Sequence, residues 1–497
     1  MNSEAFSTLL NTGRITSLAN PQAPTSGKKI DLVFRTVGES TTVHALNLAI
    51  EHIKPNTIHI VGNIRPFSYA MQSILRIKHD CDYVVYADAD CLILEDMRNF
   101  IESTDLPYID CYVRDRYRGR IHCGVHITAA ELVATMARIP EPVDNQAYVL
   151  RPESALRALA LRELGKAKSY KNFAILHDYL QSPIHIFCKY ALRELRSRTP
   201  LQRMRLTHAM QHWDSDLDFE IARTAIQHAA IHVPEDMSPK EVDTYILDLP
   251  KTAKQVLSSM DIPLHKEFDS ESIRLSLEDS KLELDDSVKP TKVFGLGLSR
   301  TGTRSLSSAL EILGFDTVHY PIDAETLDTL SRGDGKFPLL DIYDGMTDIT
   351  VCPYYKTLDN LYPGSKFILT VRDIDSWSQS CANHWEGRPA FEEGTEKNHL
   401  IHMEIRRFLR AAVYGSYDYS HMRFAAVYSD YVTSVLDYFK DRPGDLLVLN
   451  IAEGEGYEKL APFLGMKIPQ NSIFPHKGSK VTAMKKAALA AGLNQND

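Results

Sequence analysis

The stretch KVFGLGLSRTGTRSLSSAL, residues 292–310, constrains the fold of this chain more than any other. Its apolar run over Val293–Leu298 predicts a buried parallel strand. A polar turn with Gly302 near its centre follows, and apolar residues then recur at helical spacing over 305–313. The backbone N–H groups of such a turn, together with the helix N-terminus behind it, attract an anion. The stretch therefore predicts an anion-binding strand, turn and helix in an α/β fold.

The spacing of Gly297 and Gly302 resembles a nucleotide-triphosphate P-loop, but two positions depart from that motif. Thr303 stands at the lysine position, and Arg304 stands where the motif has a magnesium-binding hydroxyl. These departures weigh against a P-loop small-molecule kinase, which is kept as a second alternative.

The segment SRTGTRSL is similar to the 5′-phosphosulfate loop of sulfotransferases that use PAPS (3′-phosphoadenosine 5′-phosphosulfate). The resemblance implies that Arg300 stabilises the leaving phosphate and the transferring sulfuryl group. It also implies that the whole turn binds the phosphosulfate, through Ser299, Arg300, Thr301, Gly302, Thr303 and Arg304.

A second stretch, KFILTVRDIDSWSQS at 366–380, supports the same family. An apolar strand ends at Arg372, and a helix that carries Ser380 follows. In PAPS sulfotransferases an arginine at a strand end and a serine eight residues later bind the 3′-phosphate, which implies that role for Arg372 and Ser380. Near the C-terminus, Lys477 stands in for the family's basic loop at the 3′-phosphate. The resemblance covers about 291–480.

The acceptor implied by this resemblance is a hydroxyl of a carbohydrate or a small molecule, and a hydroxyl needs a general base. Related enzymes use histidine or glutamate. The candidates in this chain are His319, at the end of an expected strand over Phe315–Tyr320, and three aspartates, Asp341, Asp344 and Asp348. The sequence does not choose among them.

The N-terminal half alternates expected strands and helices, which predicts a parallel sheet with helices on its faces. Residues 1–28 are expected to be a loosely ordered lead-in. The expected strands are Ile30–Val37, Thr57–Val61 and Tyr83–Tyr86, and the expected helices are Thr42–Ile53 and Ser68–His79.

The triplet Asp88-Ala89-Asp90 follows the third of these strands. Because alternate residues of an extended segment point the same way, both carboxylates are expected to face one cation, such as Mn²⁺ or Mg²⁺ on a diphosphate. The context resembles a GT-A glycosyltransferase with its D-x-D motif, which implies a nucleotide-sugar donor. His177 is the first candidate for a third metal ligand, and the alternatives are His126, His208 and His212.

The length of 497 residues predicts two or three domains. We expect a GT-A-like α/β domain at 29–250, a linker rich in serine and acidic residues at 251–290, and a P-loop sulfotransferase-like three-layer α/β/α domain at 291–480. A net charge of −9 argues against a broad nucleic-acid-binding surface. Seven cysteines without a C-x-x-C pair favour reduced thiols in a cytoplasmic setting. No apolar run approaches the ~20 residues of a membrane span.

The function expected from these features is that of a bifunctional glycan-modifying enzyme. One half would transfer a sulfuryl group from PAPS to a hydroxyl, and the other would transfer a sugar from a nucleotide donor. The alternative is a sulfotransferase whose GT-A-like half is a carbohydrate-recognition module without turnover. Neither the acceptor nor the donor sugar follows from the sequence.

Overall fold

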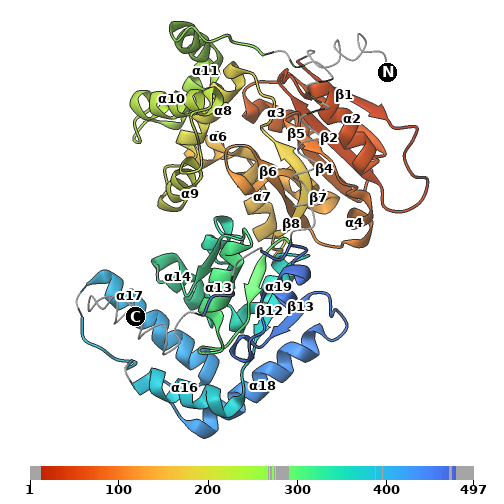
Figure 1. Ribbon diagram of the computed structural model, residues 1–497. Coiled ribbons are helices and arrows are strands. Elements are labelled where there is room, and N and C mark those ends of the chain that lie inside the picture. The colour runs from red at the N-terminus through yellow and green to blue at the C-terminus, as the bar shows by residue number, and fades with distance from the viewer. Residues whose placement is uncertain are drawn as a thin grey trace. The chain divides into compact units, whose positions relative to one another are not determined.

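The computed structural model describes residues 13–266, 268, 271, 273, 275, 290–386, 388–394, 396–469 and 473–476 (Figure 1). The chain divides into two compact units, Met1–Ser287 and Val288–Asp497. Each unit is an α/β structure built around its own sheet.

The N-terminal unit contains an eight-stranded sheet in the order β1-β3-β2-β4-β7-β6-β8-β5. The three strands predicted from the sequence, β2, β3 and β4, pair in parallel. The other pairs include antiparallel ones, so the prediction of a parallel sheet is wrong for the sheet as a whole. The strands are β1 (Ile15–Ala19), β2 (Ile30–Thr36), β3 (Thr57–Gly62), β4 (Tyr83–Asp88), β5 (Cys91–Ile93), β6 (Tyr108–Asp115), β7 (Gly119–Ala129) and β8 (Ser169–His177).

Two local features explain the mixed sheet. The connection from Asp115 to Gly119 is too short for a crossover, so β6 and β7 pair antiparallel. The strand β1 lies within the stretch expected to be a loose lead-in. It pairs antiparallel with β3, and Ile15 and Leu18 pack against the two cores of the sheet.

Helices cover both faces of this sheet. Ala45 and Leu46 of α2 pack with Ile101 of α4 into one core, whereas α3, α5 and α7 contribute to the core on the other face. The helices α8, α10 and α11 form a third core. The helices are α2 (Thr42–Ile53), α3 (Phe67–Ile74), α4 (Arg98–Ser103), α5 (Ala130–Met136), α6 (Gln146–Leu150), α7 (Pro152–Glu163), α8 (Pro183–Leu195), α9 (Pro200–Met210), α10 (Leu217–His232) and α11 (Pro239–Ser259). The last of these runs past residue 251, where the linker was expected to begin.

The C-terminal unit contains a five-stranded sheet in the order β10-β11-β9-β12-β13, and all its pairs are parallel. The carboxyl ends of the strands therefore lie along one edge, where α/β proteins bind ligands. In the edge strand β13, Leu449 is the one buried residue. The strands are β9 (Val293–Gly295), β10 (Thr317–His319), β11 (Gly345–Thr347), β12 (Lys366–Thr370) and β13 (Leu446–Leu449).

Helices cover both faces of this sheet as well. Ile368 packs in a core with α13 and α19. The residue before it, Phe367, packs against Phe439 of α18, with 4.8 Å between the ring centroids. Among the described helices, none combines the length and apolar character that a membrane crossing requires. The helices are α13 (Thr303–Ile312), α14 (Ala324–Arg332), α15 (Tyr355–Leu361), α16 (Ile374–Glu386), α17 (Lys397–Leu409), α18 (His421–Phe439) and α19 (Tyr457–Phe463), with helical turns η2 (Pro338–Asp341), η3 (Cys352–Tyr354), η4 (Arg410–Tyr414) and η5 (Ile451–Glu453).

Candidate functional site

The turn at residues 299–304, here called the anion loop, joins β9 to α13 as the sequence predicts. Gly302 begins α13 with φ 108°, a left-handed conformation that glycine adopts without strain. A Cβ atom on Gly302 would lie 3.2 Å from the Ile451 side chain, so any residue larger than glycine would crowd Ile451 at this position. Arg300 in the same turn has φ 74°. The loop is therefore a tightly fitted backbone structure.

Hydrogen bonds from distant segments fix this loop. The backbone N–H of Ser299 donates to the Tyr414 hydroxyl at 3.0 Å, and the Trp377 indole donates to the Ser299 carbonyl at 2.9 Å. The Thr301 hydroxyl donates to the Leu298 carbonyl at 2.7 Å. Because these bonds engage Ser299 and Thr301, the remaining N–H groups of the turn are held in place before any ligand binds.

A cavity of about 780 Å³ opens beside the anion loop at the carboxyl edge of the sheet. Among the described residues that line it, Asp348 is the single carboxylate. Its cationic lining is much larger and consists of Arg300, Arg304, Arg372, Arg388, Arg406 and Arg410. A cavity with this imbalance of charge suits a polyanionic ligand.

The structure brings the two predicted cofactor segments into this one cavity. All six loop residues line it, and so do Arg372 and Ser380. The Arg300 Nε donates to the Ser380 hydroxyl at 3.0 Å, which links the two segments directly. Sequence reasoning missed Ser376, whose hydroxyl accepts from the Arg372 Nε at 2.9 Å, although it lies one helical turn before Ser380. Lys477 lies outside the described residues.

The candidate bases fall on opposite edges of the sheet. His319 and Asp348 line the cavity, where Nε2 of His319 lies 3.1 Å from Oδ2 of Asp348. Asp344 lies at the amino end of β11, where its carboxylate accepts from the Asp316 N–H at 2.9 Å. The three-residue strand β11 separates Asp344 from Asp348, and neither Asp344 nor Asp341 is among the residues that line the cavity.

Burial shifts the proton affinities of the two groups in the cavity. It raises the pKa of Asp348, although His319 opposes the shift. Burial also lowers the pKa of His319 despite the neighbouring Asp348 carboxylate. The other imidazole nitrogen, Nδ1, lies 2.9 Å from the Thr347 hydroxyl. Both nitrogens of His319 are thus already engaged.

Residues 292–482 match the family model described as "Sulfotransferase domain". The C-terminal unit contains a sulfotransferase domain. A curated protein of Aspergillus versicolor, "Ava biosynthesis cluster protein M", is 26% identical to this chain over 217 residues, which are 37% of this chain and 80% of that protein. The resemblance of the C-terminal half to sulfotransferases is confirmed by the family match.

Similarity to a glycosyltransferase is weak. The apo-form glycosyltransferase GlyE of Streptococcus pneumoniae TIGR4 aligns over 73% of this chain and 90% of its own, with 10% identity and a TM-score of 0.19. A second structure of GlyE aligns over 76% of this chain and 89% of its own, with 8% identity and a TM-score of 0.20. The family match at residues 292–482 is thus the finding that bears on function.

The two aspartates of the D-x-D triplet do not face one point. Asp88 is the last residue of β4, and Asp90 lies in the turn before β5, so the extended geometry that would align them is lost. Asp88 is opposite Arg35 in the β2–β4 register, and its Oδ1 pairs with the Arg35 Nε at 2.5 Å. Arg35 also pairs with Glu153. The negative charge of Asp88 is therefore balanced by an arginine on the neighbouring strand.

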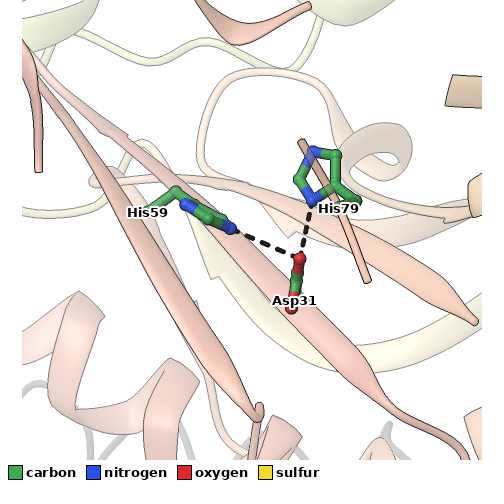
Figure 2. Close-up of side chains that lie close together, drawn as sticks. All are labelled: Asp31, His59 and His79. Carbon is green, nitrogen blue, oxygen red and sulfur yellow. Dashed lines mark hydrogen bonds and ion pairs between the residues drawn. The ribbon is translucent and has the colours of Figure 1, made fainter. Parts of the chain in front are cut away.

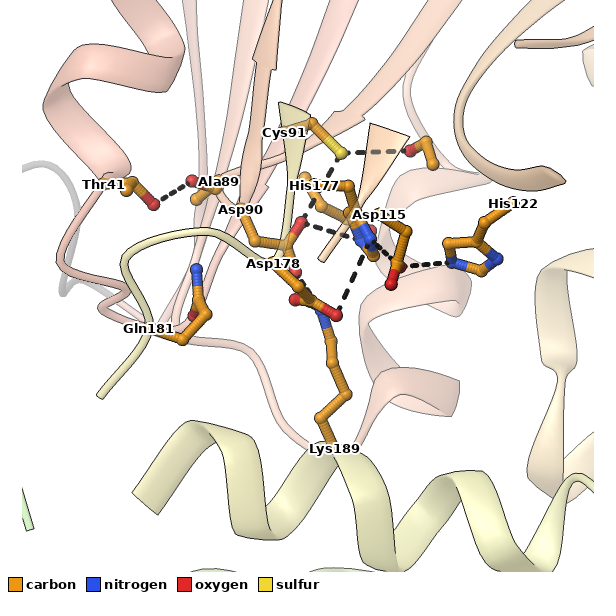
Figure 3. A network of polar contacts seen from close by, with 12 residues as sticks. Thr41, Ala89, Asp90, Cys91, Asp115, His122, His177, Asp178, Gln181 and Lys189 are labelled. Carbon is orange, nitrogen blue, oxygen red and sulfur yellow. Dashed lines mark hydrogen bonds and ion pairs between the residues drawn. The ribbon is translucent and has the colours of Figure 1, made fainter. Parts of the chain in front are cut away.

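Asp90 and His177 do come together, in a buried network at the end of β4 and β8 (Figure 3). They form with Cys91 a group whose ligand atoms all lie within 4.8 Å of one another, as a metal site requires. Nε2 of His177 lies 3.5 Å from Asp90, and its Nδ1 lies 2.6 Å from Asp115. The described residues therefore include His and Asp groups able to hold a metal, and Asp88 is in none of them.

A protein cation already occupies this network. The ammonium of Lys189, on α8, contacts the carboxylates of both Asp90 and Asp178 (Figure 3). Burial opposes the charge of Lys189, yet the two carboxylates raise its pKa well above the ordinary value. An ammonium between two carboxylates takes the place that a divalent cation would need, so the donor set does not fit a resident Mn²⁺ or Mg²⁺ as it stands.

The alternative histidines lie elsewhere. His126 contacts Asp110 at 2.8 Å. His208 of α9 and His212, two residues after that helix, lie edge to face with 5.3 Å between their ring centroids. None of the three belongs to a metal-compatible group among the described residues.

A second His and Asp cluster was not foreseen from the sequence (Figure 2). Oδ2 of Asp31 lies 2.7 Å from Nδ1 of His79 and 3.3 Å from Nε2 of His59. Asp31 is the second residue of β2, so the cluster lies at the amino ends of the parallel strands, away from the edge where α/β sheets bind ligands. These direct hydrogen bonds satisfy a buried carboxylate and stabilise the fold. His79 comes from a loop, which is why spacing along the strands gives no sign of the cluster.

Proposed function

We propose that the C-terminal unit transfers the sulfuryl group of PAPS to a hydroxyl of a carbohydrate or small-molecule acceptor. The observation that carries this proposal is the single cavity lined by the anion loop, Arg372 and Ser380. As part of the same proposal we assign 291–480 to the three-layer P-loop sulfotransferase fold and 29–250 to a GT-A-like fold. Residues 251–259, at the start of the expected linker 251–290, belong to α11 instead.

PAPS, when bound, supplies an activated sulfuryl group on a phosphate leaving group. The residues present fit such a ligand. The backbone N–H groups of the anion loop and the guanidinium groups of Arg300 and Arg304 bind the phosphosulfate end. The guanidinium of Arg304 makes no hydrogen bond or ion pair with any described residue, so its donors are available. Arg372, with Ser376 and Ser380, binds the 3′-phosphate. Removing one such charge-assisted donor typically lowers the rate by ~10²–10³.

Asp348 is the general base in this proposal. Both nitrogens of His319 have partners. In Asp348, Oδ1 accepts from the Ile349 N–H and Oδ2 lies 3.1 Å from Nε2 of His319, so each carboxylate oxygen keeps a second lone pair. Burial raises the pKa of Asp348, which makes its carboxylate a stronger base. His319 therefore orients the carboxylate, and Asp348 removes the proton of the acceptor hydroxyl.

The direct test is label transfer. The full chain is incubated with ³⁵S-labelled PAPS and a panel of hydroxyl acceptors, beside the Asp348→Asn variant and an Arg407→Gln control whose guanidinium lies over Phe391 instead of lining the cavity. We expect labelled product from the wild type and the control and little from Asp348→Asn. Absence of label transfer together with absence of PAP binding would reject the proposal, PAP being the desulfonated product of PAPS.

For the N-terminal unit we infer a recognition module without metal-dependent turnover, in preference to an active sugar transferase. The observation that favours this choice is the neutralisation of Asp88 by Arg35 and of Asp90 by Lys189. Nucleotide-sugar hydrolysis that requires Mn²⁺ and disappears in Asp90→Asn would contradict this inference and support the bifunctional enzyme instead.

A further inference from the structure

Three arginines line the cavity beyond those assigned to PAPS. Arg388 follows the end of α16, Arg406 lies on α17, and Arg410 begins η4. The guanidinium of Arg388 makes no hydrogen bond or ion pair with any described side chain, and Arg388 is an exposed residue that lines the cavity. We refer to these three residues as the second arginine set.

This set lies near the proposed base. Tyr320 directly follows His319 and also lines the cavity. Burial raises the pKa of the Tyr320 hydroxyl to about 12. Four charged groups also act electrostatically on this hydroxyl: Asp348, Arg406, Arg410 and Arg388. The Tyr320 ring lies edge-on to His402, which is one helical turn before Arg406, with 6.2 Å between ring centroids. The second arginine set and Asp348 therefore face the same part of the cavity.

Buried contacts hold the set in place. Arg410 is 4% exposed, donates to the carbonyl of Arg388 at 2.6 Å and to that of Tyr417 at 3.0 Å, and lies over the Trp385 ring. Arg406 donates to the Pro389 carbonyl at 3.0 Å. Two guanidinium groups thus fasten the segment that presents Arg388. The turn η4 is a π-helix, a conformation that is frequent at functional sites.

The set has few anions to balance it. The one ion pair among its described contacts joins Arg406 to Glu392 at 3.5 Å, and that glutamate side chain is 51% exposed. The neighbouring histidines respond to the crowding of cations, since burial and the nearby arginines together lower the pKa of His384 to about 3. Partly buried cations without counterions are costly and bind an anion strongly when one is supplied.

We propose that the second arginine set recognises an acceptor that carries its own carboxylate, phosphate or sulfate group close to the hydroxyl that is sulfated. This inference rests on the proposed sulfuryl transfer and adds the substrate class. Arg388 and Arg406 bind the anionic group of the acceptor, while Arg410 positions Arg388. The acceptor is thus a hydroxy acid or a hydroxylated phosphate or sulfate ester, and a neutral alcohol is a poor substrate.

The test is a calorimetric titration of the full chain saturated with PAP, so that the arginines assigned to the cofactor are occupied. The probes are a matched set of small ring compounds: phenyl phosphate and benzoate as anions, and benzyl alcohol as the neutral member. We expect phenyl phosphate to bind at least ~10-fold more tightly than benzyl alcohol, and Arg388→Gln and Arg406→Gln to remove most of that difference. A preference for benzoate over phenyl phosphate would assign carboxylates as the natural group.

Arg407→Gln is the matched control, because Arg407 is adjacent to Arg406 on α17 but lies over Phe391 and does not line the cavity. Its probe affinities stay at the wild-type values. Equal binding of anionic and neutral probes, or a loss of PAP affinity in Arg388→Gln as large as the loss of probe affinity, would overturn the inference. If PAP itself fails to bind, the proposed sulfuryl transfer is wrong. Titration of the same probes into the ligand-free chain then still measures whether the second arginine set binds anions.

Discussion

Nε2 of His319 lies 3.1 Å from Oδ2 of Asp348, and the register of two short strands sets this distance. His319 is opposite Thr347 in the parallel pair β10–β11, and Asp348 is the next residue after Thr347. Asp348 leaves the strand with φ 86°, a left-handed conformation that costs free energy for a residue other than glycine. Backbone strain and a buried charge thus meet at one residue, which is typical of functional sites.

Asp348→Asn tests the assignment of the base. Asparagine tolerates the left-handed conformation and keeps the hydrogen-bonding shape, so the variant should fold as the wild type does. We predict a fall in kcat of ~10²–10⁴, the usual contribution of general base catalysis. Because the substitution removes the single carboxylate among the described lining residues, PAP affinity should stay equal or increase. A variant that loses PAP affinity while its kcat is unchanged would show that Asp348 acts in cofactor binding.

His319→Gln tests the orienting role through pH dependence. The charge of His319 lowers the pKa of Asp348, so its removal raises that pKa further above the ordinary value of 3.8. The base must be deprotonated to act, and the acid limb of kcat/KM should therefore move to higher pH. The measurement is a pH–rate profile of the variant beside the wild type. If His319 were itself the base, the variant would instead lose most of its rate at every pH.

Much of this site could be predicted from the sequence because its parts are local. The anion loop is one contiguous segment, and Arg372 follows a strand that its apolar residues make recognisable in the sequence. The choice between Asp344 and Asp348 could not be made, since it depends on β11 being three residues long and on which of its ends meets His319. The second arginine set was missed because its residues are spread over a helix end, a helix and a π-helical turn.

Gly302→Ala tests the fit of the anion loop. The variant places a Cβ in a left-handed residue, 3.2 Å from Ile451, and should weaken PAP binding by ~10-fold or more through displaced N–H groups. Gly314→Ala is the matched control, because Gly314 also has a left-handed φ, of 82°, but has nothing within 4 Å of the added carbon. The control should lose ~1 kcal/mol of unfolding free energy and keep its PAP affinity. Equal PAP affinities in both variants would contradict the proposed role of the loop backbone.

Lys189→Met tests whether a protein cation replaces a metal in the N-terminal unit. We predict no saturable Mn²⁺ binding to the wild type by calorimetry, and a new site in the variant, where the carboxylates of Asp90 and Asp178 lose their ammonium partner. The exposed Lys166→Met serves as control. Stoichiometric Mn²⁺ binding to the wild type that Asp90→Asn abolishes would contradict this account.

The N-terminal unit was harder to predict than the sulfotransferase domain. The helix α2 matches its predicted limits, since its apolar spacing is regular. The mixed sheet, by contrast, depends on antiparallel partners distant in sequence, and the pairing of Asp88 with Arg35 depends on the register of β2 with β4. Spacing alone placed the two aspartates of the D-x-D triplet on one face, and the turn at Asp90 separates them.

The central claim is that the anion loop and the Arg372 segment together form one nucleotide site. Calorimetric titration of PAP into the wild type, Arg372→Ala and Arg407→Gln tests it most directly. We predict one PAP per chain, a loss of at least ~10-fold in affinity for Arg372→Ala, and an unchanged affinity for Arg407→Gln. Wild-type protein that does not bind PAP, or an Arg372→Ala variant that binds it as tightly as the wild type, would contradict the account.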